Sequence, residues 1–272
     1  TCARCGKLFK DAEGKQETTL EAEVVPAEGH TMVKTEAVAP TYFAPGNNEY
    51  YTCSVCGKVY KDAEGLTETT VADETLAMLS SAASGKFGKD DCLSWVLTED
   101  GTLTISGSGM IPNYSETITA PWYAKRMKIT SVVVESGVTY VGSYAFNACL
   151  KLTSVDLPAG VIGISSFAFQ NCSKLTSVKI PASVKSIDQG AFYGCTGLES
   201  VTLPENAYIG SRNERGYSDK GVFEACTGLT SVTVLAGARF TQNTFAGCTS
   251  LTSISIPESM TAVSYTHLRA HE

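Results

Sequence analysis

Apolar and polar positions alternate most regularly in the second half of the chain, within a short motif that recurs. In "LTSVDLP", apolar side chains stand at Leu152, Val155 and Leu157, while Ser154 and Asp156 lie between them. This alternation predicts a short strand with one buried face, and the proline that follows ends its hydrogen-bond ladder.

A helical turn precedes each predicted strand. The segment "SYAFNAC" places Ala145, Phe146 and Cys149 on one side of such a turn. Three lines of 23 residues with this order of turn and strand follow one another from residue 137. A fourth line, over residues 206–236, carries an insertion, and a fifth is one residue short. The register is marked by five cysteines, each three residues after a phenylalanine: Cys149, Cys172, Cys195, Cys226 and Cys248.

A unit of this length cannot bury its own apolar face, so the repeats must stack around a continuous core. Stacking brings the strands into a parallel sheet with neighbours about 4.8 Å apart. The segment "ITSVVVE", residues 129–135, supplies a first strand, which predicts six strands in this sheet. Before it, residues 90–114 alternate in two runs around a turn at 99–101, which predicts a hairpin that covers the first repeat.

The repeated pattern A-F-x-x-C-x-x-L-x-S-V-x-[LI]-P resembles the BspA-like leucine-rich repeat of bacterial surface proteins. The run "DGTLTISGSG", followed by "PW", is similar to the element that commonly precedes such repeats. The resemblance implies a mainly β fold with short helical turns, built as a leucine-rich repeat solenoid with parallel strands. It also implies a non-catalytic, secreted or cell-surface protein that binds other proteins, including host-surface ligands, in adhesion. The alternative is a targeting or spacer region of a larger secreted bacterial enzyme.

Two interpretations of the repeat cysteines stay open. Each cysteine stands near an aromatic residue in an apolar stretch, and a buried free cysteine behaves as a small hydrophobic side chain, which is the interpretation we favour. Equivalent cysteines on neighbouring turns are also close enough for a disulfide, although five is an odd number. A catalytic thiol is disfavoured, because the repeats contain no histidine that could act as its base.

The polar positions of the strands form the face that a solenoid commonly uses for binding. They are small, almost neutral and without the Trp, Tyr and Arg of interface hot spots, so a solvated surface and a binding surface both fit them. These positions are Ser154, Ser177, Ser200, Ser231 and Ser253, and beside them Asp156, Lys179, Thr202, Thr233 and Ser255.

The insertion "YIGSRNERGYSDKG" in the fourth repeat has a different composition. It holds Tyr208, Arg212, Arg215 and Tyr217 among glycine and serine. Insertions in solenoids often lie on the binding face, which makes these four residues a candidate partner-binding site. A surface insertion that is merely tolerated is the other interpretation.

The first 75 residues contain a second kind of repeat. Residues 1–19 and 52–70 match at 13 of 19 positions, and both carry a C-x-x-C pair, so one small module occurs twice. Alternating apolar runs and turn residues between the copies predict short strands with little core. Small units of that kind generally need a staple. The copies resemble a module found in secreted bacterial proteins.

The segment C-x-x-C-G-K has the shape of a zinc knuckle, and structural zinc takes four ligands. The candidate ligands are His30, Cys53, Cys56, Cys2 and Cys5. Tyr42 stands where the module that this segment resembles often has a further cysteine. Structural zinc, redox or disulfide use of the pairs, and unreactive thiols all stay open. Catalytic zinc is disfavoured, because no Glu or His stands at a spacing that would supply a base.

Charge is unevenly distributed and narrows the classes of partner. The net charge is −7, and residues 1–75 carry −6 of it, with 7 Lys and Arg against 13 Asp and Glu. An acidic front and a near-neutral remainder argue against nucleic-acid binding, which needs clustered cations. No run approaches the roughly 18 apolar residues of a membrane span. We expect a monomer that is secreted or displayed at the cell surface, although the sequence begins without Met and shows no signal peptide.

These patterns predict six segments. They are a truncated cysteine module (1–23), a second cysteine module (24–75), a linker (76–90), a cap hairpin region (91–128), the solenoid (129–258), and the start of a further repeat with an artefactual tail (259–272). His267 and His271 stand four residues apart in that tail, which we interpret as translated adapter sequence rather than a metal site. We therefore expect the natural protein to continue beyond both ends.

Overall fold

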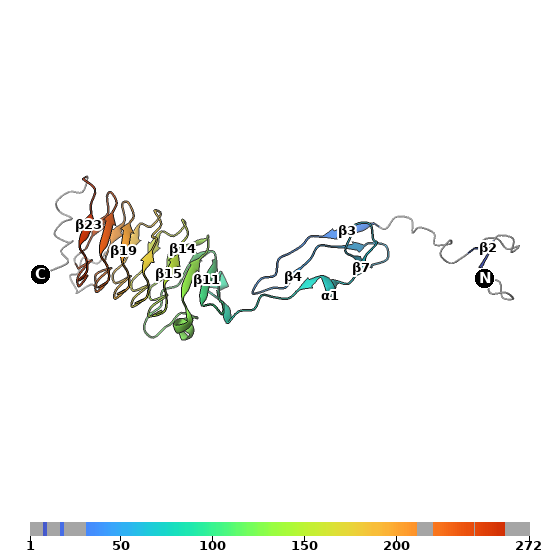
Figure 1. Ribbon diagram of the computed structural model, residues 1–272, viewed down its shortest axis with the longest axis horizontal. Coiled ribbons are helices and arrows are strands. Elements are labelled where there is room, and N and C mark those ends of the chain that lie inside the picture. Colours follow the sequence, from blue (N-terminus) through green and yellow to red (C-terminus); the bar gives the residue numbers. More distant parts are fainter. Residues whose placement is uncertain (1–7, 10–16, 19–30, 211–219, 242, 259–272) are drawn as a thin grey trace. The chain divides into compact units, whose positions relative to one another are not determined.

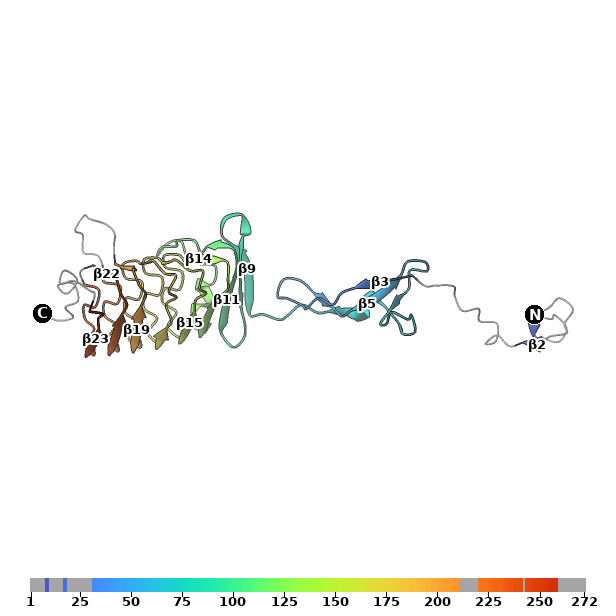
Figure 2. The same cartoon turned by 90° about the horizontal axis from the view of Figure 1, so that it is seen from above.

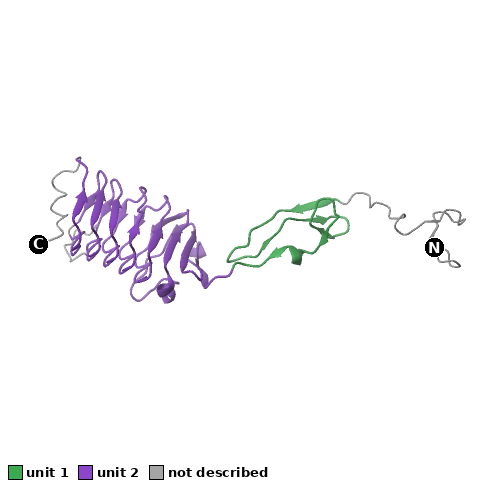
Figure 3. Cartoon of the chain, in the orientation of Figure 1, with its two compact units in different colours: residues 1–79 green, residues 80–272 purple. Residues whose placement is uncertain are grey.

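The computed structural model describes residues 8–9, 17–18, 31–210, 220–241 and 243–258. Figure 3 colours its two compact units, residues 1–79 and residues 80–272. The two units differ in how they are held together, and each is described by itself.

The first unit is built from short antiparallel strands. Its four-stranded sheet has the order β3 (Met32–Thr35), β5 (Tyr50–Cys53), β6 (Val59–Tyr60) and β7 (Glu68–Thr69). A two-stranded sheet pairs β4 (Gly46–Asn47) with β8 (Thr75–Leu76), and the one-turn helix α1 (Val71–Glu74) precedes β8. Thr70 begins α1, because its hydroxyl accepts the Asp73 N–H at 3.1 Å as an N-cap.

Two hairpins of this unit share one register. The strand β1 (Leu8–Phe9) pairs with β2 (Glu17–Thr18), so that Leu8 lies opposite Thr18. In the same way β6 pairs with β7, and Val59 lies opposite Thr69. The offset between the two pairs equals the period of the cysteine-containing sequence repeat, so the backbone pairing repeats along with the sequence.

The second unit contains the predicted hairpin around the turn at 99–101, but residues 83–87, which we expected to lie in a linker, form a further strand beside it. The antiparallel strands β9 (Ala83–Phe87), β10 (Leu93–Leu97) and β11 (Thr102–Gly107) stand in sequence order. The turn between β10 and β11 contains Gly101, whose φ of +90° is a conformation that favours glycine. The strand β11 then pairs in parallel with β13, the first strand of the repeats, and covers its outer edge.

Six repeat strands follow in parallel, as the sequence predicts, but they form two sheets rather than one. They are β13 (Ser131–Val134), β15 (Ser154–Asp156), β17 (Ser177–Val178), β19 (Ser200–Leu203), β21 (Ser231–Val234) and β23 (Ser253–Ser255). The ladder breaks between β15 and β17. There the bond from Thr176 N–H to Thr153 O is stretched to 3.5 Å, against 2.8 Å for the bond from Thr153 N–H to Thr130 O, and such a length is at the limit of a hydrogen bond.

A further parallel sheet, which the sequence analysis did not predict, joins the other side of each turn. Its six short strands are β12 (Gly109–Met110), β14 (Val138–Val141), β16 (Gly163–Ile164), β18 (Ser186–Ile187), β20 (Tyr208–Ile209) and β22 (Arg239–Phe240). Figures 1 and 2 show the strands of both sides stacked along the solenoid. Two short 3-10 helices, η1 (Lys89–Asp91) and η2 (Tyr123–Lys128), complete the unit.

One apolar core runs through the second unit between the sheets and the helical turns. The predicted core positions Phe146, Leu152, Val155 and Leu157 are all buried in it. At its centre the repeat phenylalanines stack face to face. For example, the ring centroids of Phe192 and Phe223 lie 5.3 Å apart with 3° between the ring planes. Only the last described repeat is looser: Leu251, Ile254 and Ile256 are partly buried.

Candidate interaction surfaces

The outward positions of the repeat strands form a continuous polar face. Ser154, Ser177, Ser200 and Ser253 are exposed and Ser231 is half-buried. All five residues of the neighbouring column are exposed: Asp156, Lys179, Thr202, Thr233 and Ser255. The alternation predicted from the sequence therefore directs these side chains to solvent, and the apolar residues between them point into the core.

Behind this sheet the repeat cysteines are buried free thiols, as we favoured from the sequence. The structure adds a hydrogen bond that the sequence did not indicate: Cys195 Sγ donates to the carbonyl oxygen of Phe169, in the preceding repeat, at 3.1 Å. The same contact is made by Cys172 to Phe146 O at 3.3 Å, Cys226 to Phe192 O at 3.1 Å, and Cys248 to Phe223 O at 3.1 Å. Each thiol thus satisfies a buried backbone acceptor of its neighbour.

Burial also makes four of the repeat thiols, those of Cys149, Cys172, Cys226 and Cys248, poor nucleophiles. Loss of solvent raises the pKa of Cys149 to about 12 and that of Cys248 to about 11. It raises the pKa of Cys172 and Cys226 as well. Because the thiolate is the reactive form, these side chains stay protonated and inert at neutral pH.

The turn η2, which precedes the first repeat strand, differs from the later turns at one side chain. In the turn η2, Arg126 stands at the position that a cysteine occupies in the following repeats, three residues before Ile129. Its guanidinium Nη1 donates to Tyr123 O at 3.1 Å, and its carbon Cζ lies 4.1 Å from the centre of the Tyr123 ring. By register, this carbonyl is the acceptor that the Cys149 thiol would otherwise use. The first cysteine of the column therefore differs from the other four.

An indole ring closes the stack of phenylalanines at the same end. Trp122 is buried and stacks on Phe146 with ring centroids 5.6 Å apart. Its Nε1 donates to Ala145 O at 2.8 Å, which satisfies the polar end of the indole. The "PW" that precedes the repeats thus places an aromatic ring over the first exposed turn.

The insertion of the fourth repeat leaves the solenoid directly after β20. Tyr208 is half-buried on that strand, and Ile209 beside it is fully buried. The other three candidate binding residues, Arg212, Arg215 and Tyr217, lie outside the described residues. Lys220 is the first described residue after the insertion. Its Nζ forms an ion pair with Glu224 Oε1 at 2.9 Å and lies 5.1 Å from the ring centre of Tyr193. The insertion is therefore attached to the second parallel sheet rather than to the face of β13–β23.

The cysteine pair of the second module lies in the turn between β5 and β6. Cys53 is fully buried, Cys56 is exposed, and the Cys56 N–H donates to Cys53 Sγ at 3.4 Å. Gly57, with a φ of +73°, closes this turn through its N–H to Cys53 O at 2.8 Å. A backbone N–H therefore faces the sulfur of Cys53, whereas Cys56 is exposed, so the two thiols do not share one inward direction and the knuckle stays a prediction.

The structure does not complete a metal site around this pair. The other candidate ligands, His30, Cys2 and Cys5, lie outside the described residues. Within the described ranges, no group of three or more His, Cys, Asp or Glu side chains is arranged to hold a metal ion. Zinc binding therefore stays a prediction.

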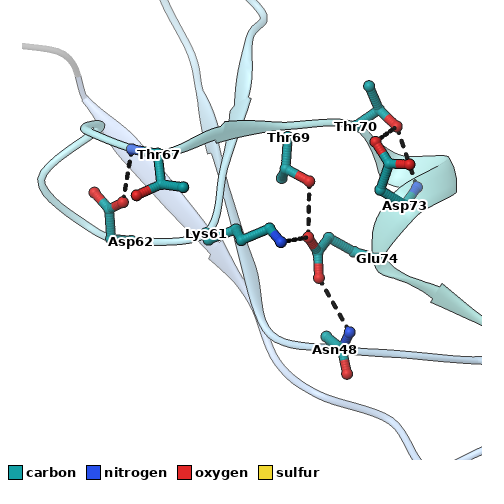
Figure 4. A network of polar contacts seen from close by, with 8 residues as sticks. All are labelled: Asn48, Lys61, Asp62, Thr67, Thr69, Thr70, Asp73 and Glu74. Carbon is teal, nitrogen blue, oxygen red and sulfur yellow. Dashed lines mark hydrogen bonds and ion pairs between the residues drawn. The ribbon is translucent and has the colours of Figure 1, made fainter.

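A buried carboxylate, that of Glu74, is the centre of a network of polar contacts in the first unit, as Figure 4 shows. Glu74 is only 4% exposed. It accepts hydrogen bonds from Thr69 Oγ1 at 2.7 Å and Asn48 Nδ2 at 3.1 Å, and pairs with Lys61 Nζ at 3.6 Å. These donors, Thr69 first, lower the pKa of Glu74 below its ordinary value. The network ties α1 to β7 and to the segment between β4 and β5.

Sequence reasoning also overlooked a surface row of lysines at one repeat position, Lys128, Lys151 and Lys174. The sequence shows this row directly, because a lysine precedes Ile129, Leu152 and Leu175, which are equivalent positions in three successive turns.

Comparison with known proteins identifies the repeats. Residues 116–214 and 218–269 match the BspA type Leucine rich repeat region, in six copies, and these ranges make up more than half of the chain. No curated protein matches. No helix within the described residues has the length and apolar character to cross a membrane.

Several solved structures are similar to this chain. A leucine-rich repeat protein of Treponema pallidum is 20% identical, with 66% of this chain and 94% of that protein covered and a TM-score of 0.46. A leucine-rich cell surface protein of Faecalibacterium prausnitzii is 25% identical over 64% of this chain, and the pneumococcal vaccine antigen PcpA is 21% identical over 61%, with TM-scores of 0.38 and 0.39. This chain spans 55% and 36% of those two proteins. With TM-scores below 0.5, these likenesses add nothing to the assignment, which rests on the family match: the chain belongs to the BspA-type leucine-rich repeat family.

Proposed function

We propose that this chain is the binding region of a non-catalytic, secreted or cell-surface bacterial protein that uses its solenoid to bind a protein partner, in adhesion to host surfaces. Leucine-rich repeat proteins typically bind other proteins and are generally non-catalytic. The observation that carries the proposal is the polar face of β13–β23, whose side chains are held at fixed spacing on a continuous core. Such a face can contact a large partner surface without paying to order itself.

Within this proposal the insertion of the fourth repeat supplies the anchoring residues, because it holds the aromatic and arginine side chains that the polar face lacks. The register of the neighbouring repeats allows a clean deletion. The Gly190 N–H bonds to Lys220 O, just as the Phe167 N–H bonds to Gln189 O. Removing residues 211–219 therefore leaves Lys220 in the place of Gln189 and restores a regular repeat, whereas a deletion from 206 onward would also remove the buried Ala207 and Ile209.

The test is a pull-down from host matrix or cell-surface protein with the intact chain and with the 211–219 deletion. The intact chain should capture a partner and the deletion should lose it while unfolding at an unchanged urea concentration. A deletion variant that binds as well as the intact chain would remove the insertion from the site. Absence of any captured partner for both would count against the binding role itself.

We propose that the first unit is a spacer that is stabilised at its cysteine pairs. Structural zinc would supply this stabilisation where His30 and a further ligand join the two cysteines. Its acidic composition and the small number of buried apolar side chains favour a spacer over a binding module. The same features support the alternative function, a targeting or spacer region of a larger secreted enzyme. Metal analysis of the purified chain tests the zinc, and the full reading frame decides the alternative, since a catalytic domain on either side would favour it. Sedimentation of the purified chain tests the expected monomer.

A further inference from the structure

Three lysines form a row along one edge of the first repeats. Lys128 and Lys151 each lie two residues before a threonine of the inter-repeat ladder, in which Thr153 N–H bonds to Thr130 O at 2.8 Å. Lys174 stands at the same position one turn further on. All three side chains are exposed, and parallel neighbours in such a stack lie about 4.8 Å apart. We call these residues the lysine row.

Two further cations adjoin the lysine row in the cap turn η2. Lys125 is exposed, and Arg126 is half-buried with its Nε enclosed and without a hydrogen-bond partner among the described residues. None of the five cations makes an ion pair within the part of the chain that the structure describes.

The row is a local reversal of charge in an acidic protein. At the equivalent position the later repeats carry Gly197, Gly228 and Ser250, so the fold does not require lysine there. Like charges one turn apart repel each other and cost stability. Two carboxylates border the row: Asp100, in the hairpin turn, is already bonded to Thr98 and Thr102, and Glu199 follows Thr176 in the inter-repeat ladder.

Apolar surface lies directly beside the lysine row. Met127 and Leu150, the residues before Lys128 and Lys151, are 44% and 40% exposed. The edge therefore presents a row of positive charges, with an exposed apolar side chain beside each of its first two lysines. This combination matches a linear polymer that alternates an anionic group with the apolar face of a sugar ring.

We propose that the lysine row, with Lys125 and Arg126, binds a linear acidic polysaccharide. An extended acidic peptide is the competing occupant, but its charged side chains offer no apolar ring face to Met127 and Leu150. The row gives one cation for each turn.

The test measures binding of the intact chain to heparin, as a sulfated probe, and to polygalacturonate, as a carboxylate probe, at increasing salt. The row variant changes Lys128, Lys151 and Lys174 to serine, the residue of the last repeat. Its control changes three exposed cations elsewhere, Lys89→Ser, Lys185→Ser and Arg239→Ser, with the same change in net charge. An unchanged urea midpoint for both variants shows that each remains folded.

We expect the row variant to lose affinity for at least one of the two polysaccharides by roughly tenfold or more at low salt, with a shallower salt dependence, and the control to lose little. Equal losses in both variants would overturn the proposal, because the attraction would then be non-specific. No binding to either probe would also overturn it. Tighter binding to poly-glutamate or to anionic phospholipid vesicles than to the polysaccharides would assign the row to an acidic protein or a membrane surface instead.

Discussion

The two units of this chain are stabilised in opposite ways. The solenoid buries a continuous set of apolar side chains, and every described repeat adds a phenylalanine to one stack. In the first unit the buried side chains among the described residues are few: Cys53, Tyr60 and Glu74. That unit relies on a cysteine turn, a carboxylate network and exposed ion pairs such as the one from Lys34 to Glu49 at 2.9 Å.

This difference teaches where sequence change is tolerated. Removing a side chain from a stacked core leaves a cavity between neighbours that cannot collapse, whereas exposed ion pairs contribute little. The solenoid should therefore depend on shape, and the first unit should depend on protonation state. The predictions that follow test this contrast, from the largest expected effect to the smallest.

Replacing Phe192 by alanine should give the largest loss. Its ring lies 5.3 Å from those of both Phe169 and Phe223, so the change opens a cavity in the middle of the stack. We expect the solenoid to lose about 3–5 kcal/mol of unfolding free energy, measured by urea denaturation followed by circular dichroism. The first unit should be unaffected. A loss below about 1 kcal/mol would show that the stack is not what holds the repeats together.

Two identical changes in the cysteine column should differ in cost. Cys195→Ser keeps a donor facing Phe169 O, whereas Cys149→Ser buries a hydroxyl at the turn where Arg126 already occupies the matching carbonyl. We expect Cys149→Ser to cost about 1–3 kcal/mol and Cys195→Ser clearly less, by the same denaturation measurement. Equal costs would mean that the hydrogen bond of the thiol contributes nothing, and an exposed Cys149 would contradict the repeat register.

Acid should unfold the first unit before the solenoid. Hydrogen bonds from Thr69 and Asn48 lower the pKa of Glu74, so the folded unit binds fewer protons than the unfolded one. This contribution to stability is present above the ordinary pKa of glutamate and is lost as the pH falls through the lowered value. Tyrosine fluorescence and NMR of the first unit, recorded from pH 7 to pH 2, measure the transition.

The control for this acid transition is Glu74→Gln, which keeps the shape and removes the charge. It should lower stability at pH 7 and weaken the dependence on pH. A variant that keeps the full acid transition would assign the effect to other carboxyls, such as Asp62, whose pKa is lowered by the Leu66 N–H.

The smallest effect is a gain. Ala225 has a φ of +62°, and the equivalent position in the next repeat is Gly247, with a φ of +71°. An L-residue in this left-handed conformation is disfavoured by its Cβ, so Ala225→Gly should stabilise the solenoid by up to about 1 kcal/mol. The reciprocal change, Gly247→Ala, should destabilise it by a similar amount. If both variants lose stability, packing rather than backbone conformation controls this turn.

The repeats and their buried faces followed from local pattern alone. In a stack, each residue meets its own equivalent on the next turn, so a strict period in sequence becomes a strict register in space. For this reason the inward positions of Leu152, Val155 and Phe146, the hairpin around Gly101 and the buried state of the cysteines could all be predicted. The row at Lys128, Lys151 and Lys174 was equally visible, but it carries a meaning only once the turns are known to be stacked.

Other features depended on contacts that no local pattern records. The second parallel sheet consists mostly of two-residue strands, such as β16 and β18, which are too short to show alternation. The break between β15 and β17 coincides with one inter-repeat hydrogen bond, from Thr176 N–H to Thr153 O, that is stretched to 3.5 Å. The network of Glu74 joins Asn48, Lys61 and Thr69 across separate strands. Periodicity reports which face of an element is buried, whereas the pairing of particular donors and acceptors is set by how distant segments meet.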